Sequence, residues 1–301
     1  MRPPLFLALF VSVISASVRG AEDSPGDWKT TTWNGERAFA ASSGQWKAIV
    51  SVERARLVYF GAAAGDHNLL FVPSTRSDPA GWGGHRLWLG PQTTWSNGWP
   101  PPAAWEKSAA EKVAVNGSRL ELTMPDAHDG WPRLTRVYFW ADGRLHCDAR
   151  ASGGTRTAQI IHILQVPALA EVRVQAAPKP DAPRGYVQVH LGRHPSPRKI
   201  FPTPPHVTES AAGELTLKFA DRMEKLGFTP QPLVARIGAN NLTIDRGASH
   251  GAVDSTPDDG YVTQVYLGSG QSPLIELEQL STLYVAGGEA NFEIVIEARA
   301  Q

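Results

Sequence analysis

Short segments in which hydrophobic and polar residues alternate, separated by glycine and proline, dominate this chain of 301 residues. In Ser118–Met124 the two leucines and the methionine point to one side, and the polar residues between them point to the other. Glu214–Phe219 and Phe292–Ala298 repeat this pattern. A period of two is typical of a β-strand with one buried face. We therefore expect an all-β protein built from antiparallel strands.

Further strands are expected where hydrophobic segments lie between turn residues such as Asn116-Gly117 and Asp142-Gly143. Helical periodicity is weak, and its best candidate is Ala103–Lys112, which follows three prolines. The other expected strands are Trp46–Val52, Arg56–Phe60, Arg133–Trp140, Arg144–Arg150, Ala158–Leu164, Glu171–Gln175, Gly185–Leu191, Leu233–Ile237, Tyr261–Leu267 and Pro273–Leu280. So many short strands with so little helix indicate a large β-sandwich.

No change in composition marks a linker inside the main part of the chain, so we expect residues 45–301 to form a single domain. The proline-rich segment 176–206 is expected to form long surface loops of that domain rather than a hinge. Residues 21–44 are polar and rich in glycine, and we expect them to be an N-terminal leader with weak strand content.

Residues 1–20 have the pattern of an export signal. Arg2 precedes an unbroken apolar run from Leu5 to Val11, and small residues follow at Ser17 and Gly20. We expect this segment to be removed and the mature protein to be secreted or periplasmic. The alternative is a buried or membrane-anchoring N-terminal helix, although the run is too short for an ordinary membrane span.

Charge and cysteine content argue against several classes of protein. Lysine and arginine total 29, as do aspartate and glutamate, so no basic excess favours binding to nucleic acid. The single cysteine, Cys147, allows neither an internal disulfide nor a cysteine-based zinc site. The sequence also lacks a phosphate loop and a dinucleotide fingerprint. We therefore expect no metal and no cofactor.

The most distinctive stretch runs from residue 83 to residue 92, with the sequence GGHRLWLGPQ, and a WPPP segment begins at Trp99. His85 and Arg86 place polar groups beside the rings of Trp88 and Trp99. Saccharides need this combination, because their C–H faces lie on aromatic rings while polar groups hold their hydroxyls. These four residues are candidate saccharide-binding residues. The alternative is that the tryptophans belong to the core and the prolines stiffen a loop.

Two carboxylates stand out in the segment Leu274–Leu280. In a strand, Glu276 and Glu278 share one face about 7 Å apart, and the apolar residues between them share the other. Like charges at this spacing are costly on a central strand unless that face lines a wet cleft, where a pKa can also rise. The alternative is an ordinary solvated sheet face.

His162 lies in the most apolar expected strand, Gln159–Leu164. A histidine in such a strand is either a core residue whose nitrogens are hydrogen-bonded or a catalytic group. The sequence around it leaves both interpretations open.

The order of these pieces resembles the galactose mutarotase-like (aldose 1-epimerase) superfamily over roughly residues 45–299, and the GGHRLW segment resembles an exported, mostly bacterial branch. This resemblance implies an antiparallel β-supersandwich with little helix. It places the catalytic acid on His162 and the catalytic base on Glu278, with the closing turn at residues 287–289. The chain departs from the pattern where Gln279 replaces a proline that often follows the glutamate, and in lacking the aromatic residues expected after the histidine.

The resemblance also implies a reaction. Glu278 would remove the proton of the anomeric hydroxyl while His162 protonates the ring oxygen, and the sugar ring would open and reclose as the other anomer. Ordinary pKa values near 4.3 for glutamate and 6.5 for histidine suit these roles at neutral pH. Arg86 and Glu276 would hold the sugar, and Trp88 or Trp99 would stack on its ring. We therefore expect Arg86, His162 and Glu278 to line one cleft.

Three hypotheses follow for the mature protein. It is a sugar epimerase, a non-catalytic carbohydrate-binding protein, or an exported structural β-protein whose tryptophans all belong to the core. In the first two hypotheses the partner is a mono- or oligosaccharide.

Overall fold

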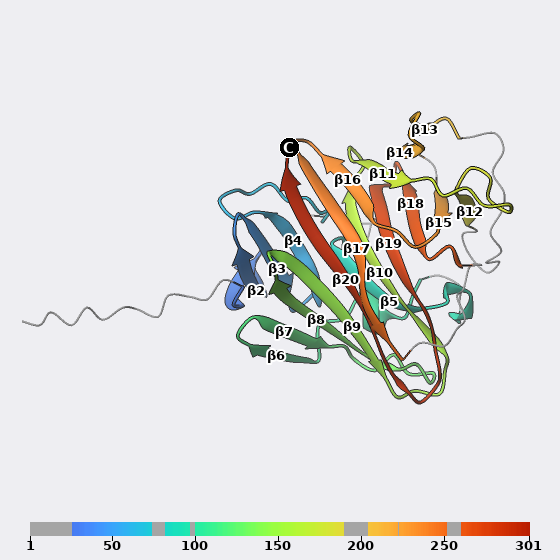
Figure 1. The fold of residues 1–301 in the computed structure, drawn as a ribbon. Helices are drawn as coiled ribbons and strands as arrows, with labels where there is room; N and C mark the ends of the chain where they lie inside the picture. Colours follow the sequence, from blue (N-terminus) through green and yellow to red (C-terminus); the bar gives the residue numbers. More distant parts are fainter. Residues whose placement is uncertain (1–25, 74–81, 97–99, 190–203, 222, 252–259) are drawn as a thin grey trace, which may run out of the picture.

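The computed structural model describes residues 26–73, 82–96, 100–189, 204–221, 223–251 and 260–301. These residues form three antiparallel sheets of four, six and ten strands (Figure 1). Every segment predicted to be a strand overlaps an observed strand. The all-β, antiparallel prediction is therefore confirmed.

The four-stranded sheet lies at the N-terminal end of the described chain. Its order is β1-β2-β3-β4. The strands are β1 (Lys29–Trp33), β2 (Glu36–Ser43), β3 (Trp46–Ser51) and β4 (Arg56–Ala62).

The expected leader at 21–44 is therefore wrong for its described part, because β1 and β2 pair with the rest of the sheet. Trp28, just before β1, is buried, and its Nε1 donates to the carbonyl oxygens of Ser118 and Tyr138 at 3.0 and 3.1 Å. The segment is polar in composition, but its threonines and tryptophans favour strands.

The ten-stranded sheet has the order β13-β14-β11-β16-β17-β20-β9-β8-β7-β6. Its strands are β6 (Lys112–Asn116), β7 (Arg119–Thr123), β8 (Arg133–Ala141), β9 (Arg144–Ser152), β11 (Glu171–Gln175), β13 (Val207–Glu209), β14 (Glu214–Lys218), β16 (Leu233–Ile237), β17 (Asn240–His250) and β20 (Glu289–Ala300).

The six-stranded sheet has the order β12-β15-β18-β19-β10-β5. Its strands are β5 (His85–Gly90), β10 (Ala158–Pro167), β12 (Val187–Val189), β15 (Glu224–Phe228), β18 (Thr263–Ser269) and β19 (Ser272–Tyr284). Strand β5 forms residues 85–90 of the distinctive GGHRLWLGPQ stretch, where no strand was predicted.

Helix is scarce among the described residues. They contain a single turn of α-helix, α1 (Ala103–Glu106), and a 3-10 turn, η1 (Gln92–Thr94). The helix expected over Ala103–Lys112 ends early, because Lys112 already pairs with Thr123 as the first residue of β6. None of the described helices is long and apolar enough to cross a membrane.

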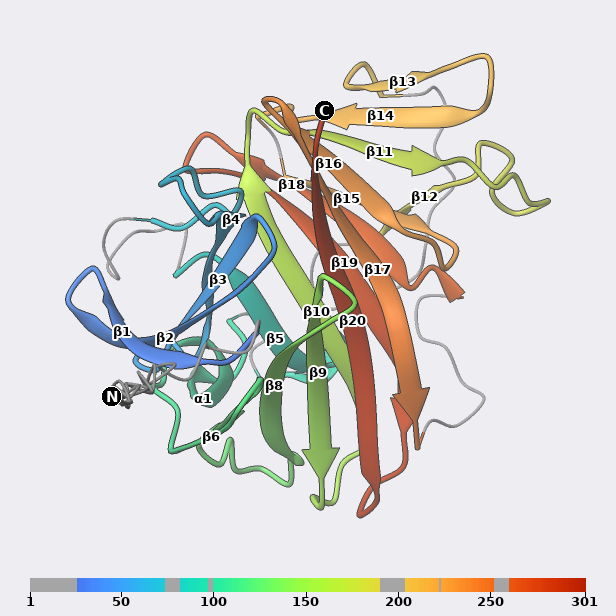
Figure 2. The same cartoon turned by 60° about the vertical axis from the view of Figure 1, so that its left-hand side comes forward.

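The core lies between the six-stranded sheet and the ten-stranded sheet, which Figure 2 shows as two layers. Strand β20 of the larger sheet packs against β10 and β19 of the smaller one. Phe292 of β20 contacts the ring of His162 on β10, with centroids 5.3 Å apart. The main hydrophobic cluster also includes residues of the four-stranded sheet, such as Val50 and Phe60.

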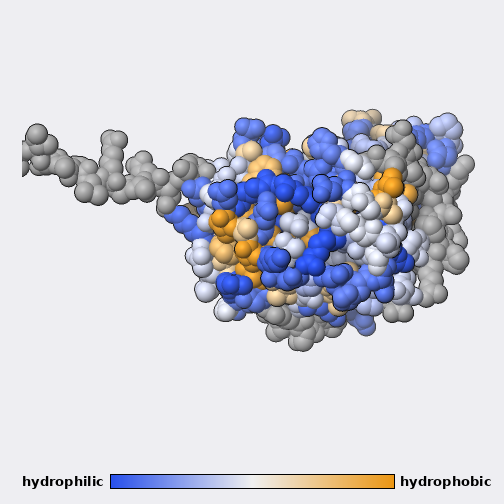
Figure 3. Space-filling view, turned by 90° about the horizontal axis from the view of Figure 1, so that it is seen from below, coloured by the Kyte–Doolittle hydropathy of each residue, from blue (hydrophilic) through white to orange (hydrophobic). Residues whose placement is uncertain are grey.

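Most of the molecular face drawn in Figure 3 is hydrophilic. The face in Figure 3 shows a hydrophobic patch surrounded by hydrophilic residues. Among the described residues, the exposed large hydrophobic side chains come from separate parts of the chain: Val115, Leu169, Met223 and Val285. Single exposed side chains of this kind are ordinary on a protein surface.

Candidate functional site

The two faces of the six-stranded sheet differ in chemistry. Ile163 of β10 pairs with Arg86 on one neighbouring strand and with Glu278 on the other, so these three side chains share a face. His162 pairs in the same way with Leu87 and Gln279 and lies on the opposite face, which packs into the core. We call the face that carries Arg86 and Glu278 the polar face.

The centre of the polar face carries the two carboxylates of β19. Arg86 Nη1 lies 2.7 Å from Glu276 Oε1, and Lys225 Nζ lies 2.9 Å from each oxygen of Glu278. All four residues are buried. Buried charges are costly unless they are paired and hydrogen-bonded. Each carboxylate therefore has its own cation, and the two cations come from opposite sides of β19.

Arg86 is held by a second carboxylate, Glu106 of α1. Its Nη2 and Nε donate to Glu106 Oε1 at 2.7 and 3.1 Å, and Trp88 Nε1 donates to Glu106 Oε2 at 2.9 Å. Burial alone would raise the pKa of Glu106, but the charges of Arg56 and Arg86 lower it to about 2. Burial opposes the charge on Arg86 as well, yet Glu106 and Glu276 raise its pKa above the ordinary value. The guanidinium is thus charged and fixed in orientation.

Two glutamines and a tyrosine complete the polar face. Gln165 Nε2 donates to Glu276 Oε1 at 2.7 Å, and Gln264 Nε2 donates to the carbonyl of Tyr261 at 3.0 Å. Tyr266 pairs with Glu276 in register and is half-buried, unlike the buried residues around it. Burial, followed by the charges of Glu276 and Glu278, raises the pKa of Tyr266 to about 12, so its hydroxyl stays protonated.

The two glycines before β5 have a structural role. Gly84 has a φ of +73°, and a Cβ at this position would lie 2.1 Å from the carbonyl oxygen of Leu57. Gly83 has a φ of +69°, and its Cβ would lie 2.5 Å from the carbonyl oxygen of Phe71. Only glycine fits such positions. The turn brings β5 into line with β10, where the amide of Gln165 donates to the carbonyl of Gly84 at 3.0 Å.

The prediction that Arg86, His162 and Glu278 share a cleft is wrong for His162. This side chain is fully buried on the core face, where its Nε2 lies 2.9 Å from the carbonyl oxygen of Phe292 and its Nδ1 lies 3.0 Å from His85 Nε2. Burial is the main reason that its pKa falls to about 3. A neutral histidine facing the core cannot protonate a ligand on the polar face.

His85, expected to bind substrate, also lies on the core face. Its Nδ1 is 3.2 Å from the hydroxyl of Tyr138, and burial lowers its pKa well below the ordinary value. The expectation of a substrate contact is therefore wrong for His85. Sequence alone could not assign the faces of β10, because its residues on both faces are apolar around His162.

The tryptophans near β5 are buried. The guanidinium of Arg86 lies over the ring of Trp88 at 4.6 Å from its centroid, and Trp95 meets the same ring edge-on at 5.3 Å. Trp88 thus supports Arg86 instead of presenting an open platform. Trp99, the other expected stacking residue, lies outside the described residues.

Sequence reasoning missed Glu106, Lys225 and Tyr266. Glu106 falls in the segment interpreted as a helix, and Lys225 falls in β15, which was not predicted. Tyr266 belongs to a predicted strand, and its alternation with Val265 and Leu267 could have placed it on a polar face. Among the residues that the structure describes, no three possible metal ligands gather into a group.

Comparisons with known proteins agree with this architecture. No protein-family model matches the chain, and no curated protein matches it in sequence. Among solved structures, a galactose mutarotase-like protein from Lactobacillus casei has a TM-score of 0.57 at 11% identity, covering 87% of this chain and 100% of that one. The protein HI1317 has a TM-score of 0.51 at 13% identity, covering 90% and 96%. The protein YeaD from Salmonella typhimurium has a TM-score of 0.50 at 12% identity, covering 91% and 94%.

At these identities the similarity concerns the fold. The chain has a galactose mutarotase-like fold, as the sequence resemblance predicted.

Proposed function

We propose that this protein binds a mono- or oligosaccharide on the polar face of its six-stranded sheet. The observation that supports this best is the pair of buried ion pairs, Arg86–Glu276 and Lys225–Glu278, on one sheet face. Such pairs do little for stability compared with a packed hydrophobic face, so their presence favours a functional role. A galactose mutarotase-like protein is among the structures with a similar fold, which suggests that the ligand is a sugar.

The groups on this face suit the parts of a sugar. Glu276 and Glu278 offer acceptors to hydroxyl groups, and the guanidinium of Arg86 offers donors. Tyr266 adds a half-buried ring for the C–H face of a pyranose and a protonated hydroxyl as donor. The fixed orientation of the ion pairs lowers the entropy lost on binding.

One observation favours a catalytic version of this site. Lys225 Nζ lies within hydrogen-bond distance of Glu278, so the face contains a carboxylate base and an ammonium acid side by side. In this version Glu278 takes the proton of the anomeric hydroxyl, and Lys225 gives a proton to the ring oxygen as the ring opens. The version with His162 as the acid is not supported, since that side chain faces the core.

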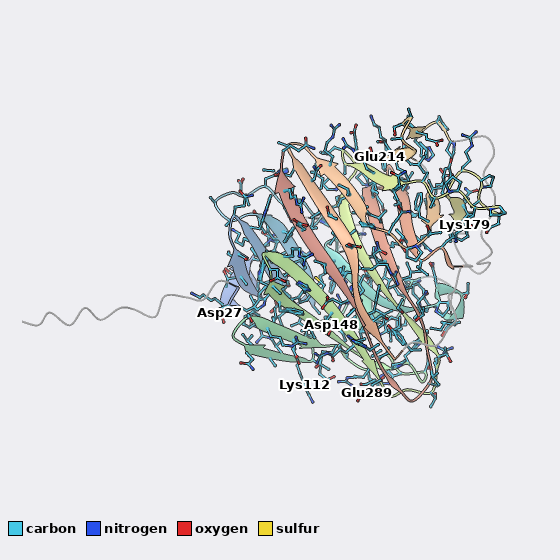
Figure 4. The ribbon with its side chains drawn as sticks, in the orientation of Figure 1. Asp27, Lys112, Asp148, Lys179, Glu214 and Glu289 are labelled. Atoms are coloured by element: carbon cyan, nitrogen blue, oxygen red, sulfur yellow. The ribbon has the colours of Figure 1, made fainter. Side chains whose placement is uncertain are left out.

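The test is a calorimetric titration of the mature protein with D-galactose, D-glucose, D-mannose and short oligosaccharides, with anomer interconversion followed by NMR. Binding without interconversion identifies a binding protein. Interconversion that Glu278→Gln abolishes, with binding retained, identifies the epimerase. The control is Glu289→Gln, which changes an exposed glutamate at the start of β20 (Figure 4). If no saccharide binds, the proposed function is wrong.

A further inference from the structure

Gln165 is a buried polar residue with half of its side-chain amide unused. The residue is 0% exposed, and its Nε2 donates to Glu276 Oε1 at 2.7 Å. Its Oε1 is buried as well and accepts no hydrogen bond from any residue that the structure describes. Buried carbonyl groups in proteins are nearly always hydrogen-bonded, so this oxygen needs a partner that the described residues do not supply.

The orientation of this amide follows from its neighbour. Glu276 is ion-paired with Arg86 and, as a carboxylate, can only accept hydrogen bonds. The NH₂ group of Gln165 must therefore face Glu276, because turning the amide over would place oxygen against oxygen. The unpaired atom is then the carbonyl oxygen and not the nitrogen.

The backbone of Gln165 is fixed by two hydrogen bonds, and its side chain is held by the bond from Nε2 to Glu276. The amide of Gln165 donates to the carbonyl of Gly84 at 3.0 Å, and its carbonyl accepts from the amide of Phe71 at 2.9 Å. Both partners lie on the β5 side of β10, where Gly84 directly precedes β5. An acceptor held in place before the ligand arrives is what a specific binding site requires.

We infer that Gln165 Oε1 accepts a hydrogen bond from a hydroxyl group of the ligand, and that it selects ligands with a hydroxyl at this position. The inference rests on the proposed function, and it adds a specificity-determining residue to that site. A group that can only accept, such as a carboxylate, sulfate or phosphate oxygen, would face the carbonyl oxygen and the carboxylate of Glu276 and would be repelled. The ligand therefore presents a hydroxyl, and not an anionic group, to Gln165.

The test compares Gln165→Met with Gln159→Met. Methionine keeps the length of the side chain and removes the acceptor. Gln159 is a matched control, because it is a buried glutamine of the same strand, 1% exposed, and lies about 20 Å away along β10. Its Nε2 donates to the carbonyl of Ser281 at 2.9 Å. Thermal unfolding of both variants checks that they fold.

The probes are D-galactose, D-glucose and D-mannose, followed by the 2-, 3-, 4- and 6-deoxy forms of whichever binds. We expect Gln165→Met to weaken binding about tenfold and Gln159→Met to leave it unchanged. One deoxy sugar should bind the unaltered protein about tenfold more weakly, yet bind Gln165→Met as well as the parent sugar does. That sugar identifies the hydroxyl that contacts Gln165.

The possible failures are distinguishable. If the unaltered protein binds none of the sugars, the proposed function is wrong and the inference falls with it. If it binds a sugar and folded Gln165→Met binds that sugar with the same affinity, the inference is wrong and the proposed function stands. Equal weakening by Gln165→Met and Gln159→Met would also overturn the inference, because it would indicate a general effect on the fold.

Discussion

Lys225 and Glu278 form an ion pair across an intervening strand. Lys225 lies on β15 and Glu278 on β19, with β18 between them, and Nζ lies 2.9 Å from both carboxylate oxygens. Arg86 reaches Glu276 in the same manner across β10. Two carboxylates about 7 Å apart on one strand are thereby neutralised from opposite sides, and their mutual repulsion is offset.

We expect Lys225→Met to lower the free energy of unfolding by about 3 kcal/mol or more, because it leaves Glu278 buried without its cation. The double variant Lys225→Met/Glu278→Gln should recover most of this loss, since both charges are then removed. Urea unfolding measures both values.

The matched control for this experiment is Lys218→Met. Lys218 lies 2.8 Å from Glu171, but its side chain is 59% exposed. We expect Lys218→Met to lower the free energy of unfolding by less than about 1 kcal/mol, because solvent screens the ion pair. If Lys225→Met costs no more than Lys218→Met, the pair in the polar face is not the desolvated interaction described above.

Gly84→Ala is expected to destabilise the fold more than a change at a matched glycine. Gly84 and Gly143 both have a φ of +73°, but only Gly84 is crowded, with the carbonyl oxygen of Leu57 2.1 Å from an added Cβ. Gly143→Ala therefore measures the conformational cost alone, about 1–2 kcal/mol. Gly84→Ala should cost about 1–3 kcal/mol more, because backbone must move. If urea unfolding shows that both variants lose the same free energy of unfolding, Gly84 does not approach Leu57 of β4 as closely as described.

The sequence predicts strands well where one face is buried and the other is not. Segments such as Glu171–Gln175 and Leu233–Ile237 alternate, and the strands found there have the predicted bounds. Strand β5 does not alternate, since all six of its residues are buried. The alternation that predicts strands elsewhere is therefore missing here, although the chain forms a strand covered on both sides.

Arg86, Glu276 and Glu278 could be singled out from the sequence, but the ion pairs that they form could not. The spacing of Glu276 and Glu278 placed both on one face, as the structure has them. The cation bound to Glu276 is 190 residues earlier in the chain. Such a pairing depends on the order and register of strands in the sheet, which local patterns do not contain. For the same reason the face of His162 followed only from its register with β5 and β19.

Residues 1–20 are proposed to be an export signal, on the pattern of Arg2, the apolar run and the small residues that follow. We expect expression of the whole chain in a bacterial host to yield a secreted or periplasmic protein whose first residue follows Ser17 or Gly20. N-terminal sequencing of the exported material checks this. Material that is exported with Met1 intact would contradict removal of the segment.

The last prediction concerns His85 and His162, whose burial in the core favours the neutral form of both rings. The carbonyl of Phe292 can only accept, so His162 Nε2 carries a proton and its Nδ1 accepts from His85 Nε2. His85 Nδ1 then accepts from the hydroxyl of Tyr138. An additional proton on either ring would leave a positive charge buried in the core, where Arg136 is also close to both rings.

Stability should consequently fall in mild acid. The pKa of His162 is about 3 in the folded protein and that of His85 is also lowered, against about 6.5 in the unfolded chain. Between these values the unfolded state binds more protons, so the free energy of unfolding decreases as the pH falls below 6.5. Each histidine contributes about 1.4 kcal/mol per pH unit. Glu106, with a pKa of about 2, contributes only below the ordinary pKa of a glutamate.

Urea unfolding between pH 6.5 and pH 4.5 measures how the free energy of unfolding depends on pH where the histidines contribute and Glu106 does not. We expect His162→Leu to reduce the slope by about 1.4 kcal/mol per pH unit, whatever its effect on stability at neutral pH. His128→Gln is the control, because the His128 side chain is 82% exposed and its change should leave the slope as it is. An unchanged slope in folded His162→Leu would show that His162 takes up its proton in the folded protein. That result would contradict a neutral pair, and with it the assignment of these histidines to the core.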